Sequence, residues 1–203
     1  MKIICIGRNY VNHAKELGNN VPDEPMFFFK PDSSVLPVRN PFYIPEWTKD
    51  VHYEVELIIK ISKLGKYIQK KHAHTYYEQI GLGIDFTARD VQKVLKEKGH
   101  PWEKAKGFDG SAVVSRKFVS KDELDLENLN FSLEKNGEEV QKGSPNKMIF
   151  GFDDIISYLS QFMTLKIGDL IFTGTPAGVG PVKDGDQLIG YLNGQQMLKV
   201  DIK

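Results

Sequence analysis

Two glutamates, Glu54 and Glu56, stand two residues apart in the segment 52–59, which is otherwise rich in apolar and β-branched residues. Because successive side chains of a strand point to opposite faces, a strand here places both carboxylates on one face. A solvated strand face would explain such a pair. The apolar residues that follow indicate instead an interior strand, whose polar face must meet a charged group.

A third acid, Asp85, ends the apolar run 81–85 just before a predicted helix, where a turn or capping residue is also expected. If its carboxylate converges with those of Glu54 and Glu56, the three cannot all stay ionised in a poorly solvated site without a cation. Oxygen ligands of this kind suit Mg²⁺, Mn²⁺ or Ca²⁺ and suit zinc poorly. About half of an octahedral shell would remain free for water or substrate, which is a catalytic arrangement.

His13 and Glu16 form a second group near the start of the chain. On a short helix, residues three apart share a face, and a carboxylate beside an imidazole fixes its tautomer and raises its basicity. This pattern predicts a general base, although an exposed ion pair fits it equally well. Because residues 18–22 are polar and rich in Gly and Asn, we expect residues 1–22 to include a mobile lid that carries the pair.

A glycine-rich loop at 174–181 follows the apolar run 170–173. It lacks the Gly-Lys-Ser/Thr ending of a Walker loop and the glycine spacing of a dinucleotide-binding fingerprint. Its backbone N–H groups and the Thr175 hydroxyl could bind a substrate carboxylate, while a tight connection between strands explains it equally well. Lys30 and Lys106, each beside aromatic residues, could present a cation to an anionic intermediate, although lysines are ordinarily solvated.

The remaining histidines and the single cysteine carry weaker signals. His52 stays a candidate because it neighbours the acidic pair, whereas His72 and His74 follow two lysines and are predicted to lie on a solvated face. Cys5, within an apolar run, is predicted to be a small buried residue rather than a nucleophile.

The elements that must position these groups are mostly strands. Asn-Gly or Asp-Gly pairs at 136–137, 184–185 and 193–194 predict hairpins. Helices are predicted at 88–98 and 154–163, with a short one at 12–17. Many strands and few helices indicate a mostly β, α+β fold rather than a doubly wound parallel sheet. Short apolar runs predict the strands at 3–6, 26–29, 53–61, 81–85, 130–135, 170–173, 187–192 and 196–202.

Composition excludes several classes of protein. The 203 residues carry 27 basic and 27 acidic side chains, so binding to nucleic acid or to an anionic membrane by bulk charge is not expected. No apolar run approaches the roughly 18 residues of a membrane span, and we expect a cytoplasmic protein because no secretory signal is recognised. Without repeats or a long linker, residues 1–203 are predicted to form a single catalytic domain.

Seven segments, in this order along the chain, resemble the fumarylacetoacetate hydrolase family. One such segment is a weak signal, whereas seven in sequence are specific, and the resemblance extends from residue 3 to residue 200. With His13 and Glu16 present, the chain is most similar to the acylpyruvase and oxaloacetate decarboxylase branch. The segments are 7–10, 29–31, 52–57, 85–90, 106–108, 148–150 and 173–176.

The resemblance implies a mixed β-sheet roll or sandwich of the fumarylacetoacetase C-terminal type, usually a homodimer, with one Mg²⁺ or Mn²⁺ per subunit. It implies metal ligands at Glu54, Glu56 and Asp85. The catalytic residues that we expect are His13, Glu16 and Lys106, and the expected substrate-binding residues are Arg8, Lys30, Gln92 and Thr175.

The expected substrate is a small 2-oxo acid. In the hypothesis, an acylpyruvate is hydrolysed to pyruvate and a carboxylic acid, oxaloacetate is decarboxylated, and both reactions pass through a pyruvate enolate stabilised by the cation and Lys106. One alternative is an isomerase or decarboxylase of unsaturated dicarboxylates from aromatic breakdown. Another is a catalytically silent metal-binding protein, against which the His13–Glu16 pair counts because binding alone needs no base.

Overall fold

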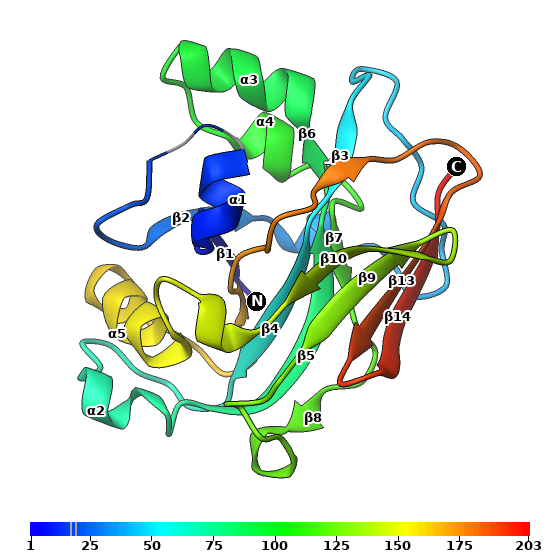
Figure 1. Ribbon diagram of the computed structural model, residues 1–203. Coiled ribbons are helices and arrows are strands. Elements are labelled where there is room, and N and C mark those ends of the chain that lie inside the picture. Colours follow the sequence, from blue (N-terminus) through cyan, green and yellow to red (C-terminus); the bar gives the residue numbers. More distant parts are fainter. Residues whose placement is uncertain (17, 19) are drawn as a thin grey trace.

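The central feature is a mixed seven-stranded sheet (Figure 1). The computed structural model describes residues 1–16, 18 and 20–203. Strands β1 and β11 pair in parallel, and the other pairs of this sheet are antiparallel. The sheet order is β2 (Met26–Lys30), β1 (Ile3–Gly7), β11 (Leu170–Phe172), β4 (Val55–Ile61), β5 (Tyr77–Asp85) and β7 (Ala112–Val114), with β8 (Val119–Ser120) also pairing with β5.

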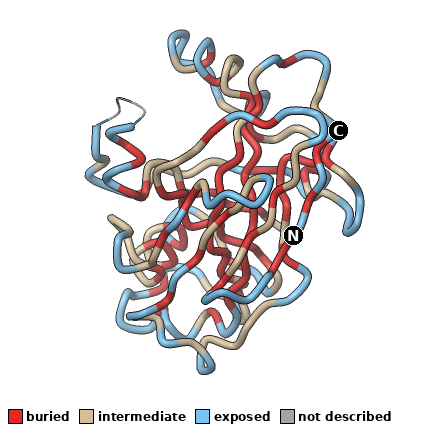
Figure 2. The backbone as a smooth tube through the Cα atoms, turned by 45° about the vertical axis from the view of Figure 1, so that its right-hand side comes forward, coloured by how far each residue is buried: buried red, intermediate tan, exposed pale blue. Residues whose placement is uncertain are grey.

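A second, four-stranded antiparallel sheet packs against the first, and the apolar core lies between them. Leu82 of β5 approaches Gly190 and Leu198 of the second sheet so closely that a Cβ on Gly190 would lie 2.7 Å from Leu82 Cδ2. Figure 2 shows the buried residues concentrated along the strands. The second sheet runs β10 (Glu138–Gly143), β9 (Phe131–Lys135), β13 (Gln187–Leu192) and β14 (Gln195–Asp201), and a small third sheet runs β12 (Gly180–Pro181), β3 (Val51–Tyr53) and β6 (Thr87–Ala88).

The helices are short and lie at the ends of the sheets, which confirms the mostly β, α+β fold (Figure 1). No helix in the described part of the chain is long and apolar enough to span a bilayer. The α-helices are α1 (Val11–Glu16), α2 (Lys70–Ala73), α3 (Arg89–Glu97), α4 (Glu103–Lys106) and α5 (Phe152–Phe162), and single 3₁₀ turns are η1 (Asp32–Ser34), η2 (Lys121–Glu123) and η3 (Pro145–Lys147).

Helices α3 and α5 confirm the two longer predicted helices, with differences at their ends. The N-cap of α3 is Ala88, so the helix begins one residue later than predicted. Helix α5 begins two residues earlier than predicted. It carries Asp153 and Asp154 in its first turn, where their negative charges interact favourably with the helix dipole. The apolar residues Ile155, Ile156 and Leu159 of α5 are buried, whereas Phe162 is 57% exposed. Helix α1 confirms the short predicted helix, whose last expected residue, Leu17, lies outside the described residues.

The predicted strand 53–61 is wrong as one element, because the chain changes sheet at Glu54. Residues before it belong to β3, which pairs with β6 and β12, while β4 begins at Val55 and pairs with β5 and β11. Asp85 ends β5, and its backbone N–H donates to the Glu54 carbonyl oxygen at 2.8 Å. The sheet change therefore brings two of the three acids together.

Two of the three predicted hairpins are present. Asn136-Gly137 and Asn193-Gly194 join β9 to β10 and β13 to β14, and all four residues have the positive φ of a type I′ turn. The hairpin predicted at residues 184–185 is wrong, because β12 and β13 belong to different sheets. Strand β10 was missed because exposed charged side chains hide its alternation.

The mobile lid was expected somewhere in residues 1–22. Strand β1 cannot belong to it, because β1 lies inside the main sheet between β2 and β11. A lid could therefore include only residues that follow Gly7, and two of these, Leu17 and Asn19, lie outside the described residues. Cys5 lies in β1 and is buried, as predicted.

Gly83 of β5 lies opposite Glu56 in the β4–β5 ladder. A Cβ there would lie 2.5 Å from Ile58 Cδ1 and 2.6 Å from the Val113 carbonyl oxygen, which is backbone and cannot rotate away. We expect Gly83→Ala to lower the free energy of unfolding by about 1–3 kcal/mol, measured by urea denaturation. The control is Gly151→Ala, whose nearest new contact is 3.7 Å away. Equal stability of both variants would contradict the packing described here.

Candidate active site

Three buried carboxylates meet at one end of the β4–β5 pair. Glu54 lies at the change of sheet, Glu56 in β4 and Asp85 at the end of β5. One carboxylate oxygen from each lies within 4.8 Å of the others, and the three residues are 5%, 2% and 1% exposed. The structure therefore brings together the acids that the sequence singled out, and they do not lie on a solvated strand face.

Both candidate lysines lie among these acids rather than in solvent. Lys106 Nζ donates to Glu54 Oε2 at 2.8 Å and to Asp85 Oδ2 at 2.7 Å. Lys30 Nζ lies 2.8 Å from Asp85 Oδ1, an ion pair without hydrogen-bond alignment, and donates to Ser111 Oγ at 2.9 Å. These contacts fix the Asp85 carboxylate from two sides.

The charges are distributed unevenly over the three acids. Burial raises the pKa of Glu54, but the charges of Lys106 and Arg89 outweigh burial and hold that pKa below its usual range. Burial, together with the charges of Asp85 and Glu54, raises the pKa of Glu56 well above its usual value. Among the described residues, Glu56 forms no ion pair, and its contact is the Gly174 N–H, 2.7 Å from Oε2.

A divalent cation fits this site. The donors are all carboxylate oxygens, and one of them lacks a positive partner, so a bound cation would allow all three acids to ionise. Oxygen donors alone favour a hard ion such as Mg²⁺ or Mn²⁺. Glu54, Glu56 and Asp85 are therefore the residues that would hold a divalent metal.

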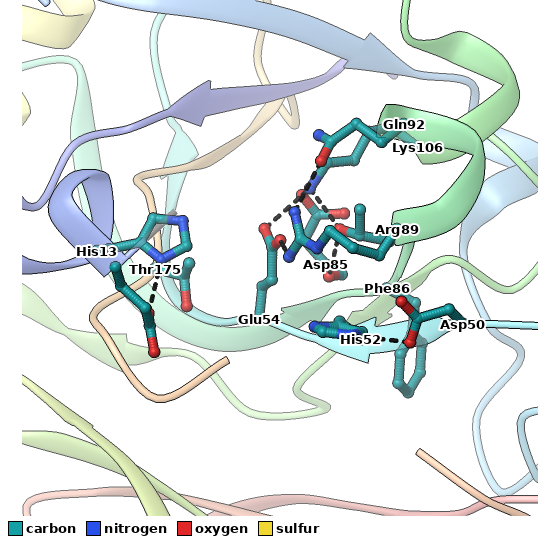
Figure 3. Close-up of polar contacts among 12 residues, drawn as sticks. His13, Asp50, His52, Glu54, Asp85, Phe86, Arg89, Gln92, Lys106 and Thr175 are labelled. Atoms are coloured by element: carbon teal, nitrogen blue, oxygen red, sulfur yellow. Dashed lines mark hydrogen bonds and ion pairs between the residues drawn. The ribbon is translucent and has the colours of Figure 1, made fainter. Parts of the chain in front are cut away.

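His13 of α1 lines the same pocket as the acids (Figure 3). His13 Nδ1 lies 3.4 Å from Glu16 Oε2, and the Gly178 N–H donates to the Glu16 carboxylate at 3.1 Å. Burial lowers the pKa of His13 more than the Glu54 charge and the Glu16 hydrogen bond raise it. His13 is thus a neutral imidazole at pH 7, oriented by a carboxylate, as a general base requires.

Backbone N–H groups of the glycine-rich loop donate to the protein's own carboxylates, so they are not free to bind a substrate. Its Gly174 and Gly178 N–H groups donate to Glu56 and Glu16, so these two donors do not face a substrate carboxylate. A Cβ on Gly178 would lie 2.2 Å from the Val140 carbonyl oxygen, which explains the glycine. Thr175 does line the pocket, and its hydroxyl accepts a hydrogen bond from Gln141 Nε2 at 2.8 Å.

Helix α3 supplies a second wall of the pocket. Arg89 pairs with Glu54 and donates to Gln92 Oε1 at 2.7 Å, so Gln92 lies beside the acids as expected (Figure 3). Arg8 also lines the pocket and has a left-handed backbone with φ of +57°, which is uncommon for a residue other than glycine. The space between these residues is about 390 Å³ when the part open to solvent is included.

Sequence reasoning missed several groups at the site. Arg89 lies in the segment 85–90, one of those that resemble the family, but no role was predicted for it. Its position one helical turn before Gln92 indicates that the two side chains share a face. Lys96 follows Gln92 by four residues, a spacing that also predicts a shared helix face, and it lines the pocket. Nothing in the sequence predicted the role of the buried Gln141. Its Oε1 accepts a hydrogen bond from the Val55 N–H at 2.9 Å, and its Nε2 donates to the Thr175 hydroxyl.

The other histidines do not join the acids. His52 Nε2 lies 2.9 Å from Asp50 Oδ1, and this pair is not among the residues that line the pocket. His72 and His74 are exposed, as the sequence predicts.

This chain is similar to several known proteins. The protein named "Oxaloacetate decarboxylase, mitochondrial" from Dictyostelium discoideum is 48% identical over 186 residues, covering 91% of this chain and 85% of that protein. "Oxaloacetate tautomerase YcgM" from Escherichia coli (strain K12) is 41% identical over 198 residues, covering 97% and 90%. The crystal structure of fumarylpyruvate hydrolase from Pseudomonas aeruginosa, in complex with Mn²⁺ and pyruvate, is 36% identical with a TM-score of 0.93, covering 100% of this chain and 89% of that one.

The profile of the family described as fumarylacetoacetate (FAA) hydrolase C-terminal matches residues 2–201. That match, these identities and the shared mixed β fold show that the chain belongs to the fumarylacetoacetate hydrolase family.

Proposed function

We propose that this protein is a divalent-metal-dependent enzyme that hydrolyses acylpyruvates to pyruvate and a carboxylic acid. The observation that carries the proposal is a histidine, in contact with a carboxylate, in the same pocket as three buried acids. A relative that binds Mn²⁺ and pyruvate supports Mn²⁺ or Mg²⁺ as the metal. We propose that each subunit binds one metal ion.

Bound to Glu54, Glu56 and Asp85, the cation would supply a Lewis acid for the carboxylate and 2-oxo oxygen of the substrate. His13 Nε2 takes a proton from water while Glu16 holds Nδ1, and the hydroxide adds to the C4 carbonyl carbon. The C3–C4 bond then breaks, C4 leaves as a carboxylic acid, and the electron pair passes to C3 and the 2-oxo oxygen. Return of the proton to C3 gives pyruvate.

Lys106 brings a positive charge to the acids, since its Nζ donates to both Glu54 and Asp85. Burial lowers its pKa, but the charges of Asp85 and Glu54 outweigh burial and raise the pKa above the ordinary value. It is therefore the proposed positive charge for the developing oxyanion. Lys30, predicted to bind substrate, is buried and does not line the pocket, so we propose instead that it holds the acid cluster in place through Asp85. Arg8, Gln92 and Thr175 are proposed substrate contacts on the pocket wall.

A reaction of oxaloacetate is the second candidate, favoured by the names of the two relatives at 48% and 41% identity. Tautomerisation moves a proton between C3 and the 2-oxo oxygen, and decarboxylation breaks the bond from C3 to the second carboxylate. Both place negative charge where hydrolysis does, so the same residues serve them, but neither needs water activation.

Several sequence expectations stay predictions. These are the single domain, the lid motion of α1, the homodimer and the cytoplasmic location. Action on unsaturated dicarboxylates and a catalytically silent metal protein also stay open as alternatives, and the assay below separates them.

The deciding assay measures product formation with Mn²⁺ or Mg²⁺ from acetylpyruvate, from oxaloacetate and from a hydroxymuconate-type diacid. Pyruvate release from acetylpyruvate supports the proposal. Turnover of oxaloacetate alone favours the second candidate, and turnover of the muconate alone favours the isomerase. No turnover of the whole panel would contradict an enzymatic function.

We expect Glu56→Gln to weaken Mn²⁺ binding by about 10-fold or more, because the amide removes one negative charge from the donor set. Titration calorimetry with the metal-free protein measures the dissociation constant. Glu78→Gln, an exposed acid on β5, is the matched control and should bind as the native protein does. Unchanged Mn²⁺ affinity in Glu56→Gln would refute the metal role.

His13→Ala should lower kcat for acetylpyruvate hydrolysis by about 10²–10⁴-fold, because the general base is lost. Oxaloacetate decarboxylation should fall far less, since it needs no activated water. The control is His72→Ala, which changes an exposed histidine. An equal loss of both activities would contradict the proposed role of His13.

The pH dependence of hydrolysis follows from the lowered pKa of His13. The base acts when unprotonated, so kcat/KM should be flat near pH 7 and fall about tenfold per unit once the pH drops below that pKa, under 6.5. Because the Glu16 hydrogen bond raises this pKa, Glu16→Gln should move the acid limb lower still. Initial rates at saturating Mn²⁺ measure it, and an acid limb centred above pH 7 would count against the assignment.

A further inference from the structure

Gln141 is a buried side chain of the second sheet that contacts two separate parts of the site. It lies on β10 and is 2% exposed. Its Oε1 accepts a hydrogen bond at 2.9 Å from the N–H of Val55, the residue between two acids of the cluster. Its Nε2 donates to the Thr175 hydroxyl at 2.8 Å and to the Pro176 carbonyl oxygen at 2.9 Å. The amide therefore joins the strand that carries the acids to the glycine-rich loop.

A β-bulge directs Gln141 into this position. In a regular strand, residues two apart lie on the same face, but Glu139 is exposed and Gln141 is buried. The register of β10 against β9 shifts between these two residues, so Val140 is the extra residue of a bulge. Bulges of this kind are common beside active sites, where they redirect a side chain. The irregular strand thus places one amide group against the glycine-rich loop.

The neighbouring backbone groups fix the orientation of this amide. The Val55 N–H can only donate, and the Pro176 carbonyl oxygen can only accept. Exchanging Oε1 and Nε2 of Gln141 would oppose two donors at Val55 and two acceptors at Pro176. Because Nε2 must therefore face the loop, its bond to Thr175 is one in which the hydroxyl oxygen is the acceptor.

The Thr175 hydroxyl is left with one hydrogen to donate. A hydroxyl group has a single O–H donor, and Gln141 occupies a lone pair of the oxygen rather than this hydrogen. Among the residues that the structure describes, none accepts a hydrogen bond from Thr175 Oγ1. Thr175 lines the same pocket as His13 and the acids (Figure 3). An acceptor oxygen on a ligand in this pocket is the partner that the hydroxyl lacks.

We propose that Gln141 is a positioning residue that makes the Thr175 hydroxyl a hydrogen-bond donor to the bound ligand. Gln141 does not itself line the pocket, so it acts through Thr175. A carbonyl or carboxylate oxygen fits this donor, whereas an N–H group of a ligand would be left without an acceptor that Gln141 has not already engaged. The inference rests on the proposed function for the substrate contact of Thr175.

The test is a double-mutant cycle measured by pyruvate binding to the Mn²⁺-loaded protein, with titration calorimetry. Gln141→Glu keeps the side-chain length and an acceptor for Val55, but a carboxyl group cannot donate to both Thr175 and Pro176. Thr175→Val removes the hydroxyl and keeps the shape. Each single variant should weaken pyruvate binding by about 10-fold, because a hydrogen bond to a charged group is lost. The double variant should bind no more weakly than Thr175→Val alone, whereas independent structural damage would add.

Three controls separate this role from damage to the fold. Mn²⁺ binding by Gln141→Glu should not be weaker than in the native protein, because the contact to the strand of acids is kept. Thr175→Ser retains a hydroxyl and should restore both pyruvate binding and the effect of Gln141→Glu. Gln79→Glu changes an exposed glutamine on β5 and should bind pyruvate as the native protein does.

A crystal structure of the native protein with Mn²⁺ and pyruvate tests the same contact without a variant. A pyruvate oxygen should lie within about 3.2 Å of Thr175 Oγ1 while Gln141 keeps its bond to that atom. Additive effects in the cycle, a pyruvate oxygen out of reach of Thr175, or no pyruvate binding by the native protein would overturn the inference. A coupled cycle in a protein that hydrolyses no acylpyruvate would support the inference and contradict the proposed function alone.

Discussion

The mutual repulsion of Glu54, Glu56 and Asp85 is the constraint on which the rest of the site depends. Three carboxylates within 4.8 Å in a buried position are unfavourable unless positive charge surrounds them. Lys30, Lys106 and Arg89 supply part of that charge and leave Glu56 without a cation. In the proposed function a divalent ion would complete the set, at a position from which it could polarise a 2-oxo acid.

The fold positions these charges through close backbone approach. The change of sheet at Glu54, the β4–β5 ladder and the Gly174 turn bring three distant segments to one point. Gly174 has φ of +102° and would place a Cβ 2.7 Å from Asn9 Cβ, so only glycine lets its N–H reach Glu56. Asn9 in turn donates to the Thr173 carbonyl oxygen at 2.8 Å, which links the loop to the segment that precedes α1. The segment that leads into α1, which carries His13, and the acid cluster are thus linked by hydrogen bonds.

The sequence predicted the acids well, because a period of two on an apolar strand and an acid at a strand end are local signals. Seven ordered motifs predicted the family, and local signals predicted the two longer helices, α3 and α5. The short helices α2 and α4 were not predicted. The break at Glu54 was not predictable, since which sheet pairs with each side depends on distant strands. The same holds for the hydrogen bonds from the Gly174 and Gly178 N–H groups to protein carboxylates. It holds also for the burial of Gln141, because both depend on long-range packing.

The measurement that tests the central claim most directly is a crystal structure of the protein grown with Mn²⁺, with anomalous scattering recorded for the metal. The account predicts one anomalous peak per subunit, within about 2.0–2.6 Å of a carboxylate oxygen of each of Glu54, Glu56 and Asp85. It also predicts remaining coordination positions that open into the pocket lined by His13 and Lys96. A peak elsewhere, or no peak at a concentration that activates the enzyme, would contradict it.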